Sequence, residues 1–327
     1  MEQDAAKKKF IGSNYFYFLI GFAFGMVILT VYGIYSSKKN VPPGKDSVLY
    51  NSGQIPNRIE LPPIPDRLNF AGERVPMENF EVKERIEREF LVNAYWYSAT
   101  ILGLQRANRW FPVIEPILKK YKIPDDFKFI PLIESNLTNA VSPAGAVGYW
   151  QITEDIAKKY GLEVNDEVDE RYNVEKSTEA ACKYILDAYS KFKSWTLAAA
   201  SFNMGINGTV NQLERQKAKD YYNLVLSDET SRYVPRLVAV KEISLHPEKY
   251  GYYLKPSELY QPLKVHFIMI DSPVENWADF AAERGINYKI LKYFNPWLRD
   301  ISLTNKKKKI YEIKMPDKGT IEMIKDE

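Results

Sequence analysis

One glutamate is a candidate for acid–base chemistry because of the apolar residues around it. Glu134 lies in the segment FKFIPLIES, directly after Leu132 and Ile133 and a few residues after Phe127 and Phe129. Burial among such side chains disfavours the ionised carboxylate, so it raises the pKa. A carboxylic acid that stays protonated near neutral pH can donate a proton to a leaving oxygen, as a glycosidase acid does. The alternative is an exposed glutamate at the end of an apolar helix, and this segment alone does not separate the two.

The residues after Glu134 indicate a binding loop. A spacing of three residues recurs there, at Ser142, Gly145, Gly148 and Gln151. Glycines let the backbone approach a ligand closely. Tyr149 and Trp150 would add flat apolar surface, and the Gln151 amide both a donor and an acceptor.

Two later segments carry further polar groups. Residues 197–205 read LAAASFNMG and place the amide of Asn203 at the end of a small-residue helix. Residues 229–234 read ETSRYV and contain Tyr233. Taken singly, each segment is equally compatible with helix packing or capping.

In this order, the motifs resemble the soluble lytic transglycosylase family, whose catalytic domain is goose-lysozyme-like. The chain is most like the membrane-bound type D transglycosylases, which carry lysin-motif tails. The resemblance covers about 124–245 and rests on Glu134-Ser135, the S-x-x-G-x-x-G-x-x-Q element, Asp169 with Arg171, the helix end Ser201–Gly205, and E-T-x-x-Y-V. Two departures are Phe202, where the family usually has Tyr, and Gly208, one position later than the usual glycine.

The resemblance implies an enzyme, a lytic murein transglycosylase. Such an enzyme cleaves the β-1,4 bond between N-acetylmuramic acid and N-acetylglucosamine in peptidoglycan and forms 1,6-anhydro-N-acetylmuramic acid, in cell-wall turnover or remodelling. Glu134 would act first as the acid and then as the base. Binding and orientation of the substrate would fall to Ser135, Ser142, Gly148, Tyr149, Trp150, Gln151, Phe202, Asn203 and Tyr233. A goose-type lysozyme-like hydrolase of the same bond and a non-catalytic peptidoglycan-binding scaffold remain as alternatives.

The composition of the 327 residues excludes several other classes of protein. With 45% hydrophobic residues the chain can form a buried core. A formal net charge of +3 is too small to indicate a nucleic-acid-binding protein. The single cysteine, Cys182, and two distant histidines, His246 and His266, argue against a thiolate or histidine metal site. No D-x-D-x-D-G calcium loop occurs, so we expect neither a metal nor a cofactor.

The N-terminal part predicts a membrane anchor followed by a tether. Residues 10–37 contain no charge, which is long enough for one transmembrane helix, so 1–37 would be a cytoplasmic tip and an anchor. The long C-terminal part would then lie outside a bacterial inner membrane, in the periplasm. A cleaved signal peptide is the alternative. Residues 38–78 are proline-rich and predict a semi-rigid linker.

The middle of the chain predicts an all-helical, lysozyme-like domain. Apolar residues from Val82 to Leu104 recur at helical spacing and predict one long amphipathic helix. Pro112 and Pro116 predict that the helices after it are short. We therefore divide this part into a helical lead-in, 79–123, and the catalytic domain, 124–245, in which we find no strand signal.

The C-terminal part predicts a small β-α-α-β module. After a linker at 246–262, strands are expected at Val265–Ile270 and Ile310–Met315, with helices at Trp277–Glu283 and Tyr288–Tyr293 between them. The module, 263–327, resembles a lysin motif, which binds N-acetylglucosamine-containing glycans. The usual Gly-Asp-Thr at its start is replaced by Asp271-Ser272-Pro273. The fold class is thus mainly α, with a transmembrane helix before the catalytic domain and this module after it.

Overall fold

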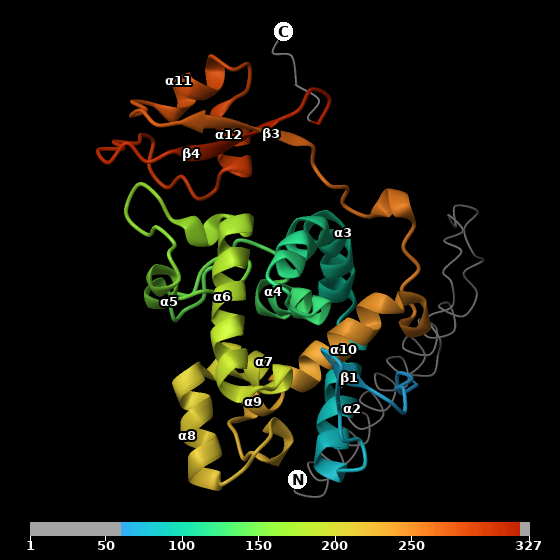
Figure 1. The fold of residues 1–327 in the computed structure, drawn as a ribbon. Helices are drawn as coiled ribbons and strands as arrows, with labels where there is room; N and C mark the ends of the chain where they lie inside the picture. The colour runs from blue at the N-terminus through green and yellow to red at the C-terminus, as the bar shows by residue number, and fades with distance from the viewer. Residues whose placement is uncertain (1–59, 321–327) are drawn as a thin grey trace, which may run out of the picture. The chain divides into compact units, whose positions relative to one another are not determined.

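A computed structural model describes residues 60–320, which form a helical domain followed by a small module of strands and helices (Figure 1). The helices of the first domain are α2 (Phe80–Tyr95), α3 (Tyr97–Lys120), α4 (Phe129–Ser135), α5 (Glu154–Lys159), α6 (Val174–Phe192), α7 (Trp195–Met204), α8 (Ile206–Gln216), α9 (Asp228–Ser231) and α10 (Tyr233–Leu245). The structure confirms that this domain is mainly helical. Among residues 60–320 no helix is both long and apolar enough to span a membrane. The predicted anchor lies outside the described residues.

The helices pack around one core whose large side chains come from distant parts of the chain. Phe90, Phe127, Phe129, Trp150 and Ile185 are all fully buried. Helix α10 runs beside α2 and also contacts α4 (Figure 1). This packing brings the first residue of α10 to the end of α4, where the candidate acid lies.

The prediction of one long helix from Val82 to Leu104 is wrong. The chain breaks at Trp96, which has non-helical angles (φ −84°, ψ 61°) between α2 and α3. The Thr100 hydroxyl donates to the Asn93 carbonyl (2.7 Å) across the break and satisfies a group that the interrupted helix leaves free. The apolar spacing continues through the break, so periodicity alone could not locate it.

The prediction of short helices around Pro112 and Pro116 is also wrong. Both prolines lie inside the 24-residue helix α3. Each proline removes one backbone hydrogen bond. Helix α3 nevertheless buries Ala107, Ile114 and Leu118 along one face, and such tertiary packing supplies most helix stability in proteins.

The region predicted as linker contributes to the helical domain. Leu68, Phe70 and Val75 are buried in its core, around a two-stranded hairpin of β1 (Asn69–Phe70) and β2 (Glu73–Arg74). The Glu73 carboxylate accepts hydrogen bonds from the backbone N–H groups of Trp195 (2.6 Å) and Thr196 (2.9 Å), at the start of α7. A carboxylate stabilises a helix N-terminus, so this hairpin fixes α7 in place.

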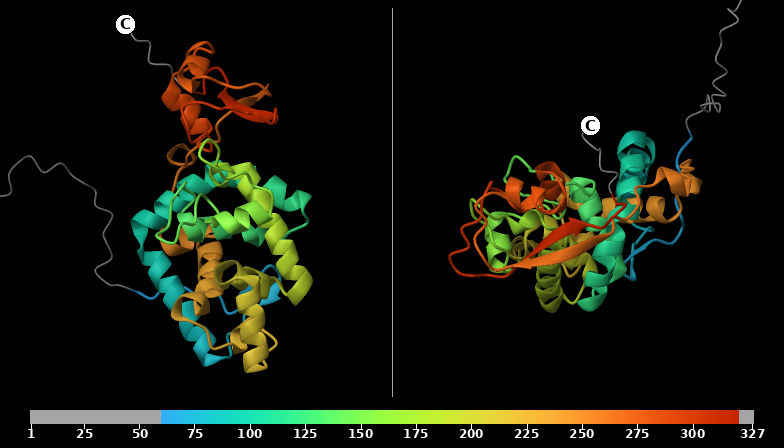
Figure 2. Two further views of the ribbon diagram at one scale, coloured as in Figure 1. Left: turned by 90° about the vertical axis from the view of Figure 1, so that its left-hand side faces the viewer. Right: turned by 90° about the horizontal axis from the view of Figure 1, so that it is seen from above.

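The C-terminal module has the predicted β-α-α-β order. Strands β3 (Val265–Ile270) and β4 (Tyr311–Pro316) pair antiparallel, with Ile268 opposite Ile313, and α11 (Trp277–Ala282) and α12 (Tyr288–Phe294) lie between them in sequence (Figure 2). Its own core includes Trp277 and Leu291, both fully buried.

The module is docked onto the segment that precedes α6 by backbone and charged contacts. The Asp169 N–H donates to the Trp297 carbonyl (2.9 Å), and Val168 forms a β-bridge with Leu298. Val168 is fully buried and packs in the core of the module. The Lys314 ammonium pairs with the Glu175 carboxylate (2.5 Å). The two domains therefore share apolar as well as polar surface.

The loop between α4 and α5 is held by one close backbone approach. Gly148 has a φ of 82°, and a Cβ there would lie 2.1 Å from the Arg171 carbonyl oxygen. The Arg171 guanidinium forms a bidentate pair with Asp169 (2.9 and 2.7 Å) and also donates to the Gly145 carbonyl (3.2 Å). Only glycine combines this φ with this contact.

We predict that Gly148→Ala lowers the free energy of unfolding by about 2–5 kcal/mol, since a left-handed backbone costs about 1–2 and overpacking about 1–3. Gly145→Ala is the matched control, because Gly145 has a φ of 78° but no atom within 4 Å of a Cβ. It should lose only about 1–2 kcal/mol. Urea unfolding of both variants measures the difference, and equal losses would contradict the close-packing argument.

Candidate active site

Helix α4 presents Glu134 at the edge of the core. The short helix buries Phe129, Ile130 and Leu132, and it ends at Asn136, which adopts a left-handed conformation (φ 50°). The Asn136 side-chain amide donates to the Ala99 carbonyl on α3 (3.1 Å). This contact fixes the end of α4 against α3, and Glu134 lies in the last turn of the helix so anchored.

Within residues 60–320 the Glu134 carboxyl has one hydrogen-bond partner, and the group is largely removed from solvent. The Tyr233 hydroxyl donates to its Oε1 (2.6 Å). Burial raises the pKa of Glu134, and the charge of Glu229 adds to the rise. The Tyr233 hydrogen bond and the charge of Arg236 lower this pKa, but they offset only part of the effect of burial. The carboxyl is therefore poised to hold a proton at a pH where an exposed glutamate has lost it.

Tyr233 is positioned by the turn that joins α9 to α10. The Ser227 hydroxyl caps α9 by accepting from the Thr230 N–H (3.3 Å), and Tyr233 is the first residue of α10. Its side chain is buried, and this burial raises the pKa of the Tyr233 phenol well above its usual value. The hydroxyl thus stays a neutral hydrogen-bond donor toward the Glu134 carboxyl.

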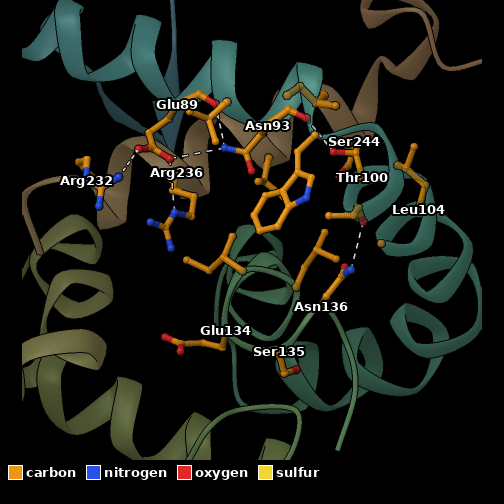
Figure 3. Close-up of a pocket in the computed structure, with 18 of the residues that line it drawn as sticks. Glu89, Asn93, Thr100, Leu104, Glu134, Ser135, Asn136, Arg232, Arg236 and Ser244 are labelled. Carbon is orange, nitrogen blue, oxygen red and sulfur yellow. Dashed lines mark hydrogen bonds and ion pairs between the residues drawn. The ribbon is translucent and has the colours of Figure 1, made fainter. Parts of the chain in front are cut away.

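A cleft of about 620 Å³ opens beside Glu134. Its walls come from α2, the break at Trp96, α3, α4 and α10. Figure 3 shows Glu134 and Ser135 on one wall, with Glu89, Arg232 and Arg236 across the cavity. The volume is in the range of ordinary ligand sites, so the carboxyl is reachable from this cleft.

The opposite wall carries a buried carboxylate with three arginine partners. Glu89 is only 1% exposed, and its carboxylate accepts from Arg88 (2.5 Å), Arg232 (3.4 Å) and Arg236 (3.3 Å). A buried charge must be paired in this way. Glu89 thereby anchors Arg236, whose positive charge acts on Glu134. Glu89 and Glu134 are the acidic residues among those that line the cleft.

The polar side chains predicted to bind substrate at the end of α4 and in the following loop form hydrogen bonds to backbone groups of the protein itself. The Ser135 hydroxyl donates to the Tyr149 carbonyl (2.9 Å), and Ser142 Oγ accepts from the Ala146 N–H (3.0 Å). The Gln151 amide donates to the carbonyls of Ala140 (3.0 Å) and Gly148 (2.8 Å). Ser135 also lines the cleft, whereas Ser142 and Gln151 hold the loop that backs it.

The predicted aromatic surface is divided between interior and wall. Trp150 is fully buried, and its indole N–H donates to the Thr178 hydroxyl (2.8 Å), so it offers no face to a ligand. Phe202 packs edge-on against Tyr184, with ring centroids 5.4 Å apart. Tyr149 lines a second cavity and not the cleft beside Glu134.

Asn203 lies beside the α9 turn. Its side-chain oxygen accepts from the Thr230 hydroxyl (2.8 Å), and its amide nitrogen donates to Glu229 (3.4 Å). Glu229 acts on the pKa of Glu134, so Asn203 and Tyr233 belong to the same network around the carboxyl.

Sequence reasoning missed the far wall of the cleft. Its signal was present in α2, where Glu89 follows Val82 and Ile86 on the apolar face of the helix. A carboxylate on such a face needs cationic partners, and Arg232 and Arg236 lie one helical turn apart. What the spacing could not supply was that α10 packs against α2.

The fold and the site together define a helical domain with a half-buried, reachable carboxyl group, joined to a small β-α-α-β unit. Residues 112–225 match the family model of the transglycosylase SLT domain. Residues 266–319 match that of the soluble lytic transglycosylase C-terminal LysM-like domain. The chain therefore carries an SLT transglycosylase domain with a C-terminal LysM-like domain.

Curated relatives agree with these family matches. The chain is 29% identical over 253 residues to membrane-bound lytic murein transglycosylase D of Escherichia coli K12, and equally to that of Escherichia coli O6:H1. It is a distant homologue of these proteins. The match covers 74% of this chain and 54% of each relative, so the chain spans about half their length.

A solved structure is also similar in part. An X-ray structure of an inactive mutant of lytic transglycosylase Slt from Pseudomonas aeruginosa is 20% identical, with a TM-score of 0.35. The match covers 46% of this chain and 26% of that one.

We predict that Glu134→Gln stabilises the fold at alkaline pH. The pKa of Glu134 is higher in the folded protein than in the unfolded chain. The folded state therefore loses stability as the pH rises from the pKa of this group in the unfolded chain to its pKa in the folded protein. The neutral amide carries no such penalty. Thermal midpoints of the full chain at pH 4.5 and pH 8 should show an advantage for the variant that is larger at pH 8, and a pH-independent difference would contradict the raised pKa.

We predict that Glu89→Gln costs about 2 kcal/mol of unfolding free energy, because hydrogen bonds to charged groups contribute about 1.5–3 kcal/mol. Glu87→Gln on the same helix is the control, since Glu87 is exposed and only reaches Lys83 at 3.8 Å. It should change stability by less than about 0.5 kcal/mol. Equal effects in denaturant titrations would show that the arginine cluster contributes no net stability.

Proposed function

We propose that this protein is a lytic transglycosylase that cleaves the β-1,4 bond between N-acetylmuramic acid and N-acetylglucosamine of peptidoglycan and forms 1,6-anhydro-N-acetylmuramic acid. The observation that carries the proposal is the Glu134 carboxyl, half-buried, hydrogen-bonded to Tyr233 and open to a cleft. The SLT family match supports the reaction class. In this proposal residues 124–245 are the catalytic domain and 263–327 bind glycan.

The first step needs a proton donor at the glycosidic oxygen. Protonated Glu134 donates its proton to the glycosidic oxygen, and the bond between this oxygen and the anomeric carbon of the muramic acid breaks. The positive charge that develops at that carbon is stabilised by the acetamido group of the same sugar. Burial keeps the acid protonated before this step, because it raises the pKa.

The second step needs a base, and the same group serves. Glu134 is now ionised and removes the proton from the C6 hydroxyl, whose oxygen bonds to the anomeric carbon and closes the 1,6-anhydro ring. The carboxyl ends in its starting state, and no water is consumed. A second, independent carboxylate is not needed, in contrast to the usual pair of a glycosidase. Glu89, paired with three arginines, is not placed to act as one.

The neighbouring residues position the acid and the sugar. Tyr233 orients the carboxyl by its hydrogen bond, and Ser135 ties the end of α4 to the binding loop. Asn203 holds Glu229 and faces the same network, where an amide can bind a sugar acetamido group. Small displacements of such groups are costly to catalysis.

We further propose that residues 1–37 anchor the protein in a bacterial inner membrane, with the catalytic domain on the periplasmic side. The support is the uncharged stretch of residues 10–37 and the membrane-bound relatives. Peptidoglycan glycan strands would be the partner of both folded domains.

We predict that Glu134→Gln lowers cleavage of purified peptidoglycan by at least about 100-fold, since general acid–base catalysis contributes about 10²–10⁴-fold. Mass spectrometry of the products should show anhydro-muramic ends with the unmodified chain and none with the variant. Glu87→Gln should retain full activity, because Glu87 is exposed on the outer side of α2.

Other product patterns would identify the alternatives. Reducing muramic ends that disappear in Glu134→Gln would make the protein a goose-type lysozyme-like hydrolase. Binding to peptidoglycan without any product from the unmodified chain would favour a non-catalytic scaffold. Retention of more than a tenth of the activity by Glu134→Gln would remove its acid–base role.

We predict that Tyr233→Phe moves the alkaline limb of the pH–activity profile to higher pH. The Tyr233 hydroxyl stabilises ionised Glu134, so its removal raises the pKa of the acid further and extends the pH range in which it is protonated. The maximal rate should fall because the carboxyl loses its orienting partner. A limb that moves to lower pH would contradict this role of Tyr233.

A further inference from the structure

A second cavity, of about 430 Å³, lies between the helical domain and the C-terminal module, outside the proposed cleavage site. The helical domain contributes residues of α3, the turn at 137–139 and the start of α6. The module contributes residues of β3, α12 and β4, and the linker adds Tyr260 and Pro262. Docking of the two domains therefore creates this cavity.

The cavity adjoins the cleft beside Glu134 along two segments. On α3, Thr100, Gly103 and Leu104 line the cleft, and Arg106 on the next turn lines the cavity. On the segment after α4, residues 134–136 line the cleft, and residues 137–139 line the cavity. The residues that line the cleft and those that line the cavity thus follow one another closely on both segments.

The walls of the cavity carry an excess of positive charge. Arg106, Arg109, Lys292 and Lys314 face a single acid, Glu175, which is paired with Lys314 (2.5 Å). In the part of the chain that the structure describes, the other three cations form no ion pair with a carboxylate. They instead donate to the neutral oxygens of Asn136, Gln261 and Tyr293, and Leu298.

The charged form of Lys292 is disfavoured at its position in this cavity. Burial and the charge of Arg299 lower the pKa of the Lys292 ammonium. A bound anion would offset both effects, because an opposite charge stabilises the charged form.

Two lining residues also have buried polar atoms without a protein partner. Asn139 Oδ1 and the Trp297 indole N–H are buried and make no hydrogen bond, and the Trp297 side chain is only 2% exposed. Buried polar groups are nearly always paired, so an unpaired acceptor and an unpaired donor in one cavity point to a polar ligand. Trp110 and Tyr149, packed edge to face at 5.0 Å, supply an apolar wall.

We propose that this cavity is a second binding site, which holds the acidic stem peptide of a peptidoglycan strand whose glycan lies in the cleft. The carboxylates of such a peptide fit the unpaired arginine and lysine groups. Its amide groups fit the unpaired Asn139 and Trp297 atoms, and its short side chains fit the aromatic wall. This proposal rests on the proposed function, because it takes peptidoglycan as the ligand.

The test compares binding of two probes to the full chain carrying Glu134→Gln, which prevents cleavage during the measurement. One probe is the disaccharide tetrapeptide purified from peptidoglycan, and the other is the same disaccharide without its peptide. Isothermal titration calorimetry should show at least tenfold tighter binding of the peptide-bearing probe. The advantage should fall below threefold in Arg106→Met, and Lys119→Met, an exposed position on the same helix, should keep it.

A second variant keeps the test decisive if Arg106→Met fails to fold. Val265→Trp fills the cavity from β3 without changing a charge and should remove the same advantage. Equal binding of the two probes, or an advantage that survives in the folded variants, would overturn the proposal. Cleavage of peptidoglycan by the unmodified chain is assayed separately, so a failure of the proposed function is distinguished from a failure of this site.

Discussion

The structure depends on keeping one carboxyl group out of water while leaving it open to a ligand. Burial raises the pKa of Glu134, and the Tyr233 hydroxyl and the Arg236 charge offset only part of this rise. These opposing effects leave the pKa of the carboxyl above that of an exposed glutamate, and a raised pKa is what the proposed acid–base role requires. A fully buried carboxyl would be inaccessible, and a fully exposed one would be ionised. The short α4 helix, fixed at its end by Asn136, places the group between these limits.

The surrounding elements serve this placement from three directions. Helix α10 supplies Tyr233 at its first residue, and it is held against α2 by the buried Glu89 cluster. The loop after α4 is fixed by the close approach of Gly148 to the Arg171 carbonyl. The C-terminal module docks on the segment of residues 163–175 beside that loop and shares apolar core with it through Val168. The helical domain and the module together line a second, cationic cavity.

Sequence reasoning succeeded where local chemistry decides structure and failed where packing does. The apolar run around Glu134 correctly predicted a raised pKa, and the order of strands and helices in the C-terminal module is confirmed. The break at Trp96 cannot be predicted because the apolar spacing continues through it, whereas the prolines inside α3 are tolerated because the packing of that helix outweighs local preference. Trp150 was expected to face a ligand, but the interior of a domain accepts an indole whose N–H is paired, here with Thr178. The cleft wall at Glu89 could not be predicted, because it forms only when α2 meets α10.

The most direct test of single-carboxylate catalysis asks whether water enters the product. Peptidoglycan is cleaved by the full chain in water enriched in ¹⁸O, and the muramic ends are analysed by mass spectrometry. We expect anhydro ends without ¹⁸O, because the C6 oxygen of the sugar itself attacks the anomeric carbon. Incorporation of one ¹⁸O at the anomeric position of reducing muramic ends would contradict it and show that water is the nucleophile on this scaffold.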